Sequence, residues 1–295
     1  MSVYGDSNFI KKINLYEEEY LIPSSDKYHQ YSGRYYIDGV NGDDSNDGLT
    51  SATPFKTIER LLELFNKGMC DVRCYIISAG TYTISKTTCE ECTLHIQANV
   101  DGVELKYVAG GVFYNSHINL KGLDSTHPLV ISTEETDTEL IYFENCAVAL
   151  NSVKFKDFSK VSFIGGFVNS NNSIFPILWC DGVNGEFIDT EISRPDLDVG
   201  IMARRGCNLI VRSNLKFGEV SSTYNLINVE RSRFVFYPLT LGNNSQITTG
   251  TSIQSRTSII QSTTNVINSL DALASTNHDF GAATLWVTTN ATIPV

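Results

Sequence analysis

From residue 70 onward, short apolar runs alternate with residues that favour turns. Runs such as CYIISAG, VALNSVKF and NLIVRSNLKF are separated by Gly, Asn, Asp and Ser. Apolar residues at every second position place one side of a strand in a core. Comparable runs begin at Phe163, Phe187, Leu209 and Phe234. This regular spacing, with no helix in each repeat, predicts a parallel β-helix with about seven or eight coils over residues 70–245.

A β-sandwich is the structural alternative, because it is also built from short strands. It predicts hairpin turns every ~8–12 residues, often as two-residue Asn-Gly or Asp-Gly turns. Such hairpin signals are few in this chain. The pattern therefore favours the β-helix.

The segment before residue 70 reads YYIDGVNGDDSNDGLTSATPFKTIERL over residues 35–61. A short strand is followed by a loop rich in Gly, Asp and Asn, which tolerate left-handed backbone angles and bond their own main chain. Thr53 and Pro54 give a helix-start signal, with a hydroxyl N-cap and Pro at the first helical position. Apolar residues then recur at helical spacing until Gly68, which predicts a short amphipathic helix over residues 54–67.

This stretch resembles the N-terminal segment of pectate-lyase-like right-handed parallel β-helix proteins, above all those of phage tailspikes and tail fibres. The resemblance implies that the loop and helix cap the open end of the stack, and that the protein is a homotrimer. It covers only the N-terminal part of the chain, while the rest matches only in its period, and no catalytic residue is carried over from it. The matching residues are Tyr36, Asp38, Asn41, Gly42, Asp44, Asn46, Asp47, Gly48, Pro54, Phe55, Lys56, Thr57 and Ile58, with Ala79, Gly80, Thr81 and Tyr82 at the first coil.

These patterns divide the chain into four segments. Residues 1–33 are Tyr-rich without a clear period and suggest an N-terminal arm for virion attachment or packing. Residues 34–69 hold the loop and capping helix, and residues 70–245 the parallel β-helix. Residues 246–295 are rich in Ser, Thr and Asn, with a short helical run at 270–274. We expect this last segment to cap the final coil or to form a trimer, since an open sheet edge invites aggregation.

The formal net charge of −11 and the pI of about 4.9 make polyanionic partners unfavourable. Nucleic acid and anionic membrane surfaces attract Lys and Arg clusters, so neither is expected as a partner. The N-terminus has no apolar run of signal-peptide length, and no run reaches the length of a membrane span. We therefore expect synthesis in a host cytoplasm and no membrane insertion.

Two sets of residues raise the question of a metal. Cys70, Cys74, Cys89 and Cys92 have a spacing similar to that of a zinc ribbon, although the first pair is not a tight CxxC and Cys74 suits a strand as a small apolar residue. The loop residues Asp43, Ser45 and Asp47 mimic the first half of a calcium loop, but Pro54 stands where a bidentate Glu is needed. Asx turns without a metal explain this loop better, and we expect no cofactor.

Pairs of carboxylates are the candidates for catalysis, because glycoside hydrolysis needs two carboxylates about 5 to 9.5 Å apart. Residues one coil apart stack at about 4.8 Å, so acids separated by one period are candidates. Two pairs qualify: Asp157 with Asp181, and Asp196 with Glu219, the latter near Arg194, Arg204 and Arg205. Among 33 acids such pairs arise by chance, so we assign no catalytic residue.

Other chemical signals are weak. The histidines, at 29, 95, 117, 127 and 278, are isolated in sequence, and no nucleophile elbow or phosphate-binding glycine loop is present. Trp179 and Trp286 are candidate platforms for stacking sugars, although the apolar run ILWC favours core packing for Trp179.

Two functions fit these observations. The first is a bacteriophage virion protein of tail-fibre or tailspike type that attaches to a host-surface glycan and contacts other virion tail or capsid proteins. The second is a polysaccharide depolymerase, hydrolase or lyase, on the same scaffold. The length of 295 residues favours binding over catalysis, because a full tailspike with anchor, β-helix and C-terminal domains is longer.

Overall fold

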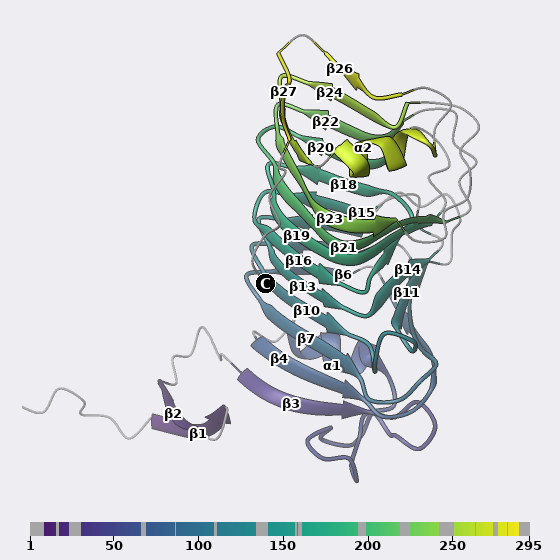
Figure 1. Cartoon of the computed structure of the whole chain (residues 1–295). Helices are drawn as coiled ribbons and strands as arrows, with labels where there is room; N and C mark the ends of the chain where they lie inside the picture. Colours follow the sequence, from purple (N-terminus) through teal and green to yellow (C-terminus); the bar gives the residue numbers. More distant parts are fainter. Residues whose placement is uncertain are drawn as a thin grey trace, which may run out of the picture.

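Almost every strand in the computed structural model lies parallel to its neighbours, and the strands stack into a long column (Figure 1). The structure describes residues 9–15, 18–23, 31–65, 69–85, 87–108, 111–133, 141–156, 158, 161–193, 199–218, 225–241, 251–262, 264–273, 277–281 and 283–288. In these ranges the strands stack as a parallel β-helix, and the same ranges include two helices. The fold predicted from the sequence is confirmed.

Each coil crosses three faces of the column. The first face holds β3 (Tyr31–Ile37), β4 (Met69–Ile76), β7 (Thr93–Ala98), β10 (His117–Lys121), β13 (Ala147–Asn151), β16 (Phe167–Asn171), β19 (Asn184–Ser193), β21 (Asn208–Gly218), β23 (Arg233–Leu241), β25 (Ile259–Ser262) and β27 (Leu285–Thr288). The second face holds β5 (Gly80–Ile84), β8 (Val103–Tyr107), β11 (Leu129–Thr133), β14 (Val153–Lys156), β17 (Ile174–Phe175) and the later parts of β19, β21 and β23. The third face holds β6 (Thr87–Glu90), β9 (Gly111–Tyr114), β12 (Ile141–Glu144), β15 (Val161–Ile164), β18 (Leu178–Asp181), β20 (Val199–Arg204), β22 (Asn225–Glu230), β24 (Ile253–Arg256) and β26 (Asp279–Phe280).

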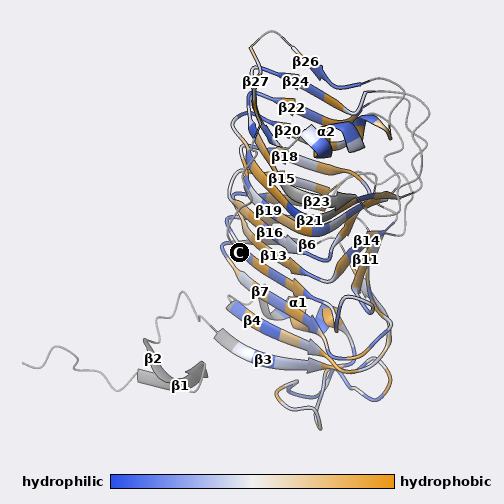
Figure 2. Cartoon of the chain, in the orientation of Figure 1, coloured by the Kyte–Doolittle hydropathy of each residue, from blue (hydrophilic) through white to orange (hydrophobic). Residues whose placement is uncertain are grey.

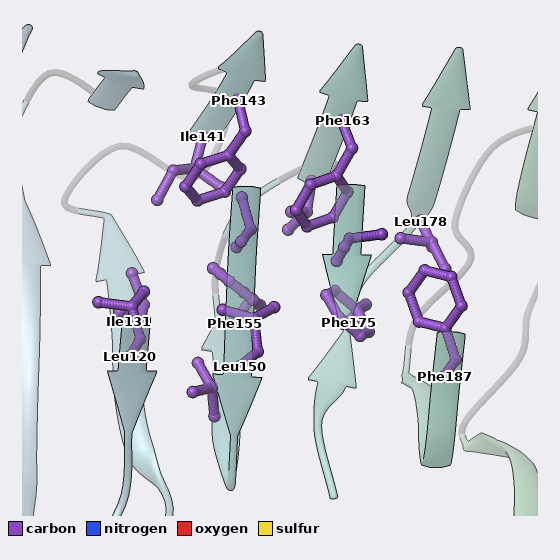
Figure 3. Packing of buried hydrophobic residues seen from close by; sticks show 14 of the residues in the cluster. Leu120, Ile131, Ile141, Phe143, Leu150, Phe155, Phe163, Phe175, Leu178 and Phe187 are labelled. Atoms are coloured by element: carbon purple, nitrogen blue, oxygen red, sulfur yellow. The ribbon is translucent and has the colours of Figure 1, made fainter. Parts of the chain in front are cut away.

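The interior of the column is a continuous apolar core. Apolar and polar residues alternate along the strands, and their inward positions are buried (Figures 2 and 3). Phe113, Phe143 and Phe163 stack from coil to coil, with ring centroids 5.1 Å apart in both pairs. This separation is close to the strand spacing of about 4.8 Å, so the backbone repeat itself brings the rings into contact.

Coil length varies more than the sequence pattern indicated. Leu209 pairs with Phe234 in the next coil, as the period predicts. Phe163 and Phe187, however, lie on different faces, in β15 and β19, and the partner of Phe163 is Cys180. The predicted repeat between Phe163 and Phe187 is therefore wrong. The coil is shorter here because β17 is brief and β18 follows it almost at once.

The turn from the third to the first face is similar in successive coils. A residue with positive φ follows the strand, as at Asn115 and Asn145, and the turn then places a side chain inside the column. The N–H of Val183 donates to the Cys207 sulfur at 3.4 Å, and the N–H of Cys207 donates to the Ser232 hydroxyl at 3.1 Å. In these coils the inward side chain thus satisfies a buried donor of the coil before it. The inward positions are Cys92, Ser116, Cys146, Val183, Cys207, Ser232 and Ser258.

The N-terminal loop is held by its own polar groups and by Phe55. Phe55 forms a parallel bridge with Ile37, and its ring stacks on Tyr35 with centroids 5.8 Å apart. The ring also lies where a Cβ on Gly48 would stand, and Gly48 has a φ of +70°, so glycine is required there. The loop thus covers the first strands as a compact unit.

The capping helix α1 (Ile58–Phe65) begins later than residue 54, where the sequence pattern placed its start. Thr57, and not Thr53, acts as the cap: its hydroxyl accepts the N–H of Arg60 at 3.3 Å and donates to Asp44 at 2.9 Å. The expected start is wrong because the segment before the helix pairs with β3, which keeps it extended. Ile58 and Leu61 are buried, and α1 contacts β4 and β5 at the beginning of the column (Figure 1).

The parallel sheets continue past residue 245, the predicted end of the β-helix. β24 pairs with β22, β25 with β23, and β27 with β25. The helix α2 (Thr264–Asp271) lies between β25 and β26, starts before the expected run at 270–274, and buries Val266, Ile267 and Leu270. Trp286 on β27 packs against the core, with its ring centroid 5.5 Å from that of Phe280.

The N-terminal arm holds β1 (Phe9–Leu15) and β2 (Glu18–Pro23), which pair antiparallel as a separate two-stranded sheet. The sequence pattern predicted no element there. None of the helices in the described ranges has the length and apolar content to cross a membrane.

Candidate functional site

Only one acid of the candidate catalytic pairs lies in the described part of the chain. Asp157, Arg194, Asp196 and Glu219 fall outside it. Asp181 ends β18 and pairs in register with Ile164 in the coil before and Arg204 in the coil after, so its described stacking neighbours are not carboxylates. Its side chain is only 6% exposed, accepts a hydrogen bond from Arg204 Nε at 3.1 Å and forms an ion pair with Arg205 at 3.3 Å. These contacts give Asp181 a structural role.

The expected burial of Trp179 in the core is wrong. Trp179 is on the outer side of β18, between the buried Leu178 and Cys180, and is partly exposed. The Arg204 guanidinium covers its ring at 4.4 Å from the centroid. Trp286 is packed at the C-terminal end of the core instead. Arg204 covers one side of the Trp179 ring, and Trp286 packs against the core. Neither indole is therefore a fully open platform for a sugar.

The structure describes some of the candidate metal ligands. Cys74 is fully buried on the inner side of β4, and the sulfur of Cys92 contacts the Ser116 hydroxyl at 3.5 Å. The side chains of Cys70 and Cys89 lie outside the described part of the chain. In the loop, Asp43 accepts the N–H of Ser45 at 2.8 Å and Asp47 accepts that of Leu49 at 3.0 Å. These are Asx turns, and the bonds lower the pKa of both carboxyls.

The first face has a shallow depression of about 250 Å³ across β4, β7 and β10, which we call the β4–β10 depression. Its outward side chains form two rows, because register partners stack on neighbouring strands. One row is Arg73, His95 and Asn119, and the other is Tyr75, Gln97 and Lys121. At about 4.8 Å per strand and about 7 Å between alternate residues, the grid measures roughly 10 by 7 Å. The backbone thus presents six polar side chains on one small surface.

His95 lies at the centre of the first row and is half-buried. Burial lowers its pKa, and the nearby positive charge of Arg73 lowers it further. Asp71 acts in the opposite direction, and His117 on β10 adds to the lowering. The two histidines that are isolated in sequence are therefore close together in the fold. Near neutral pH, His95 is an uncharged imidazole that can donate and accept hydrogen bonds.

Farther along the same face, Phe167 is an exposed aromatic residue. Its side chain is 47% exposed, although it begins strand β16. Its register partners are Ala147 and Asn184, both exposed, and Asn169 is the next outward residue on its strand. Small and amide side chains thus surround the ring and leave it accessible. An accessible ring beside amides suits stacking on the apolar side of a sugar, with hydrogen bonds to its hydroxyls.

Neither feature was among the sites predicted from the sequence. The predicted candidates were tryptophans and carboxylate pairs, whereas the first face presents Phe167 and a polar grid that contains two cations. One signal in the sequence could have indicated the depression. In the strands RCYIIS, TLHIQA and HINLK, alternation defines which positions face outward, and the residues there are polar but not acidic.

Comparison with protein-family models gives no match for this chain, and no curated protein matches its sequence. The fold and the first face are therefore the basis for inferring a function.

Proposed function

We propose that this chain is a bacteriophage virion protein of tail-fibre or tailspike type, which attaches to a glycan on the host surface. Solenoids commonly bind along one extended face, where the repeat places outward side chains in rows. The observation that carries the proposal is the first face, where the accessible ring of Phe167 stands among alanines and asparagines. The capped β-helix supplies a rigid scaffold for such a face.

The virion location and homotrimer assembly belong to the same proposal. Support for self-association comes from the C-terminal end of the first face. There Ile259, Leu285 and Val287 are exposed apolar residues, at 39%, 58% and 38% exposure. β27 pairs only with β25 among the described strands, and an unpaired strand edge is a template for pairing with another chain. Light scattering on the purified protein would show three times the monomer mass if the proposal holds, and a monomer would remove the homotrimer from it.

The glycan proposal is tested by binding to an array of bacterial surface polysaccharides. We expect the intact protein to bind at least one glycan, and Phe167→Ala to weaken that binding about tenfold or more. Leu49→Ala is the matched control, because Leu49 is similarly exposed, at 52%, but lies in the N-terminal loop. Binding to no glycan, or equal effects of the two substitutions, would contradict the proposal.

The same samples address the depolymerase alternative. A binding protein leaves the number of reducing ends unchanged and produces no ultraviolet absorbance of unsaturated sugars. A rise in either signal would make the protein an enzyme, and loss of that signal in Asp196→Asn or Glu219→Gln would identify the carboxylates.

A further inference from the structure

The β4–β10 depression differs in charge from the rest of the molecule. The chain carries a formal net charge of −11. The residues lining the depression nevertheless include Arg73 and Lys121 and no carboxylate; the others are Cys74, Tyr75, His95, Ile96, Gln97 and Asn119. In an acidic protein, this local excess of positive charge attracts anions to one place on the surface.

Three cations elsewhere on the column have carboxylate partners. Arg212 pairs with Glu186 on the first face, and Lys216 pairs with Glu191 at 2.9 Å on the second face. Arg204 pairs with Asp181 on the third. Lys121, by contrast, has no ion pair with any side chain that the structure describes.

Asp71 is an acid whose charge also acts on His95. It precedes Arg73 on β4 and does not line the depression. Its effect on the pKa of His95 is smaller than those of burial and of Arg73. Of these two side-chain charges, Arg73 therefore has the larger influence on His95.

The grid places the two cations at opposite corners. Arg73 begins the row on β4, and Lys121 ends the other row on β10. Both belong to the lining of the one depression, together with His95 and Gln97. A guanidinium binds a carboxylate or phosphate through two parallel hydrogen bonds, and an ammonium adds a point charge. The amides and the Tyr75 hydroxyl can bond neutral hydroxyl groups around that anion.

We propose that the β4–β10 depression binds an anionic group, a carboxylate or a phosphate, carried by a saccharide. This inference rests on the proposed glycan attachment and specifies the class of glycan. The volume of about 250 Å³ is below the range of pockets that enclose a whole drug-sized ligand. The depression therefore holds one charged sugar unit of a chain that continues over the face.

Three probes test the inference by calorimetric titration of the full chain in one buffer: tetragalacturonate, uncharged maltotetraose, and inorganic phosphate. We expect tetragalacturonate or phosphate to bind and maltotetraose to bind at least tenfold more weakly. Binding of tetragalacturonate but not of phosphate would indicate a site for a carboxylate. Binding of phosphate would indicate a site for a phosphorylated sugar. Affinity falls as salt rises, because the attraction is ionic.

Variants locate the binding. Arg73→Gln and Lys121→Gln should each weaken anion binding about fivefold or more, and Arg73→Lys should have an intermediate effect because it keeps the charge but loses the guanidinium fork. Lys56→Gln is the control, because it removes one positive charge from an exposed position in the N-terminal loop. In proton NMR, the pKa of the His95 imidazole should rise when the anion binds.

The outcomes separate this inference from the proposed function. Equal binding of charged and uncharged oligosaccharides, or unchanged anion binding in both Gln variants, would overturn the anionic site. If the glycan array still showed binding sensitive to Phe167→Ala, attachment to glycans would stand. Absence of binding to the array and to all three probes would overturn both.

Discussion

Arg204 and Trp179 are stacked on the third face, with the guanidinium carbon 4.4 Å from the centroid of the indole. Arg204 also donates from Nε to the buried carboxylate of Asp181 at 3.1 Å. One arginine thus connects the outer surfaces of β18 and β20. A cation over an aromatic ring contributes about 0.5–2 kcal/mol, depending on its exposure to water.

This contact predicts a stability role for Asp181. Asp181→Ala removes the acceptor of two arginines, and we expect the free energy of unfolding to fall by about 1–3 kcal/mol. The control is Glu230→Ala, since Glu230 is the other register partner of Arg204 but is exposed. It should change stability by no more than about 0.5 kcal/mol. Urea denaturation measures both, and equal effects would contradict a special role for Asp181.

Phe163 and Phe167 are two phenylalanines close in sequence whose substitution should affect stability very differently. Phe163 is 2% exposed and stacks on Phe143, whereas Phe167, at the start of the next strand, is 47% exposed. Phe163→Ala should lower the free energy of unfolding by about 3–5 kcal/mol, because it opens a cavity in the core. Phe167→Ala should change it by less than about 0.5 kcal/mol. Comparable losses of stability would show that Phe167 belongs to the core.

The inward side chains at the turns between the third and first faces predict that substitution of two buried cysteines by serine affects stability differently. Cys207→Ser should cost less than about 1 kcal/mol, because Ser232 and Ser258 hold the equivalent place in the following coils. Cys180→Ser should cost about 1–3 kcal/mol, because it buries a hydroxyl among apolar residues. Thermal unfolding of both variants checks this, and a larger loss for Cys207→Ser would contradict the equivalence of the turns.

The lowered pKa of His95 gives a pH prediction. In the folded state, burial and Arg73 disfavour the imidazolium, whereas the unfolded chain takes up a proton near its ordinary pKa of about 6.5. Between these two pKa values the unfolded state binds more protons. This residue's contribution to stability is therefore present above about pH 6.5 and decreases as pH falls toward the folded pKa.

His95→Gln should make the free energy of unfolding less dependent on pH in this window. Urea titrations at several pH values measure the difference. An unchanged pH profile in His95→Gln would show that His95 does not titrate differently on folding.

The features that the sequence predicts well are local. Asp43 and Asp47 each accept a hydrogen bond from the main-chain N–H two residues later in the chain. Residue types alone therefore indicate these two turns. Alternation likewise defines which strand residues face the core. The start of α1 could not be obtained in this way, because a tertiary pairing between Phe55 and Ile37 keeps the preceding segment extended.

The candidate site depends on coil length, which the sequence does not define. Arg73 and His95 are register partners, and their spacing matches the period of the apolar runs. For Asp181, however, the partner in the preceding coil is Ile164, and that coil is markedly shorter. A fixed period therefore finds some stacked pairs and misses others. Gly165 and Gly166 form a turn between Phe163 and Phe167, which interrupts the alternation and puts the second ring outside.

The two proposals together place one acidic saccharide chain across the first face, from the depression to Phe167. β4 and β16 are four strand steps apart, about 19 Å at about 4.8 Å per step. The most direct test is calorimetric titration with a dimer and a hexamer of galacturonate. We expect the hexamer to bind at least tenfold more tightly, with Phe167→Ala weakening the hexamer alone and Arg73→Gln weakening both. Equal affinity of dimer and hexamer, unaffected by either substitution, would contradict this arrangement.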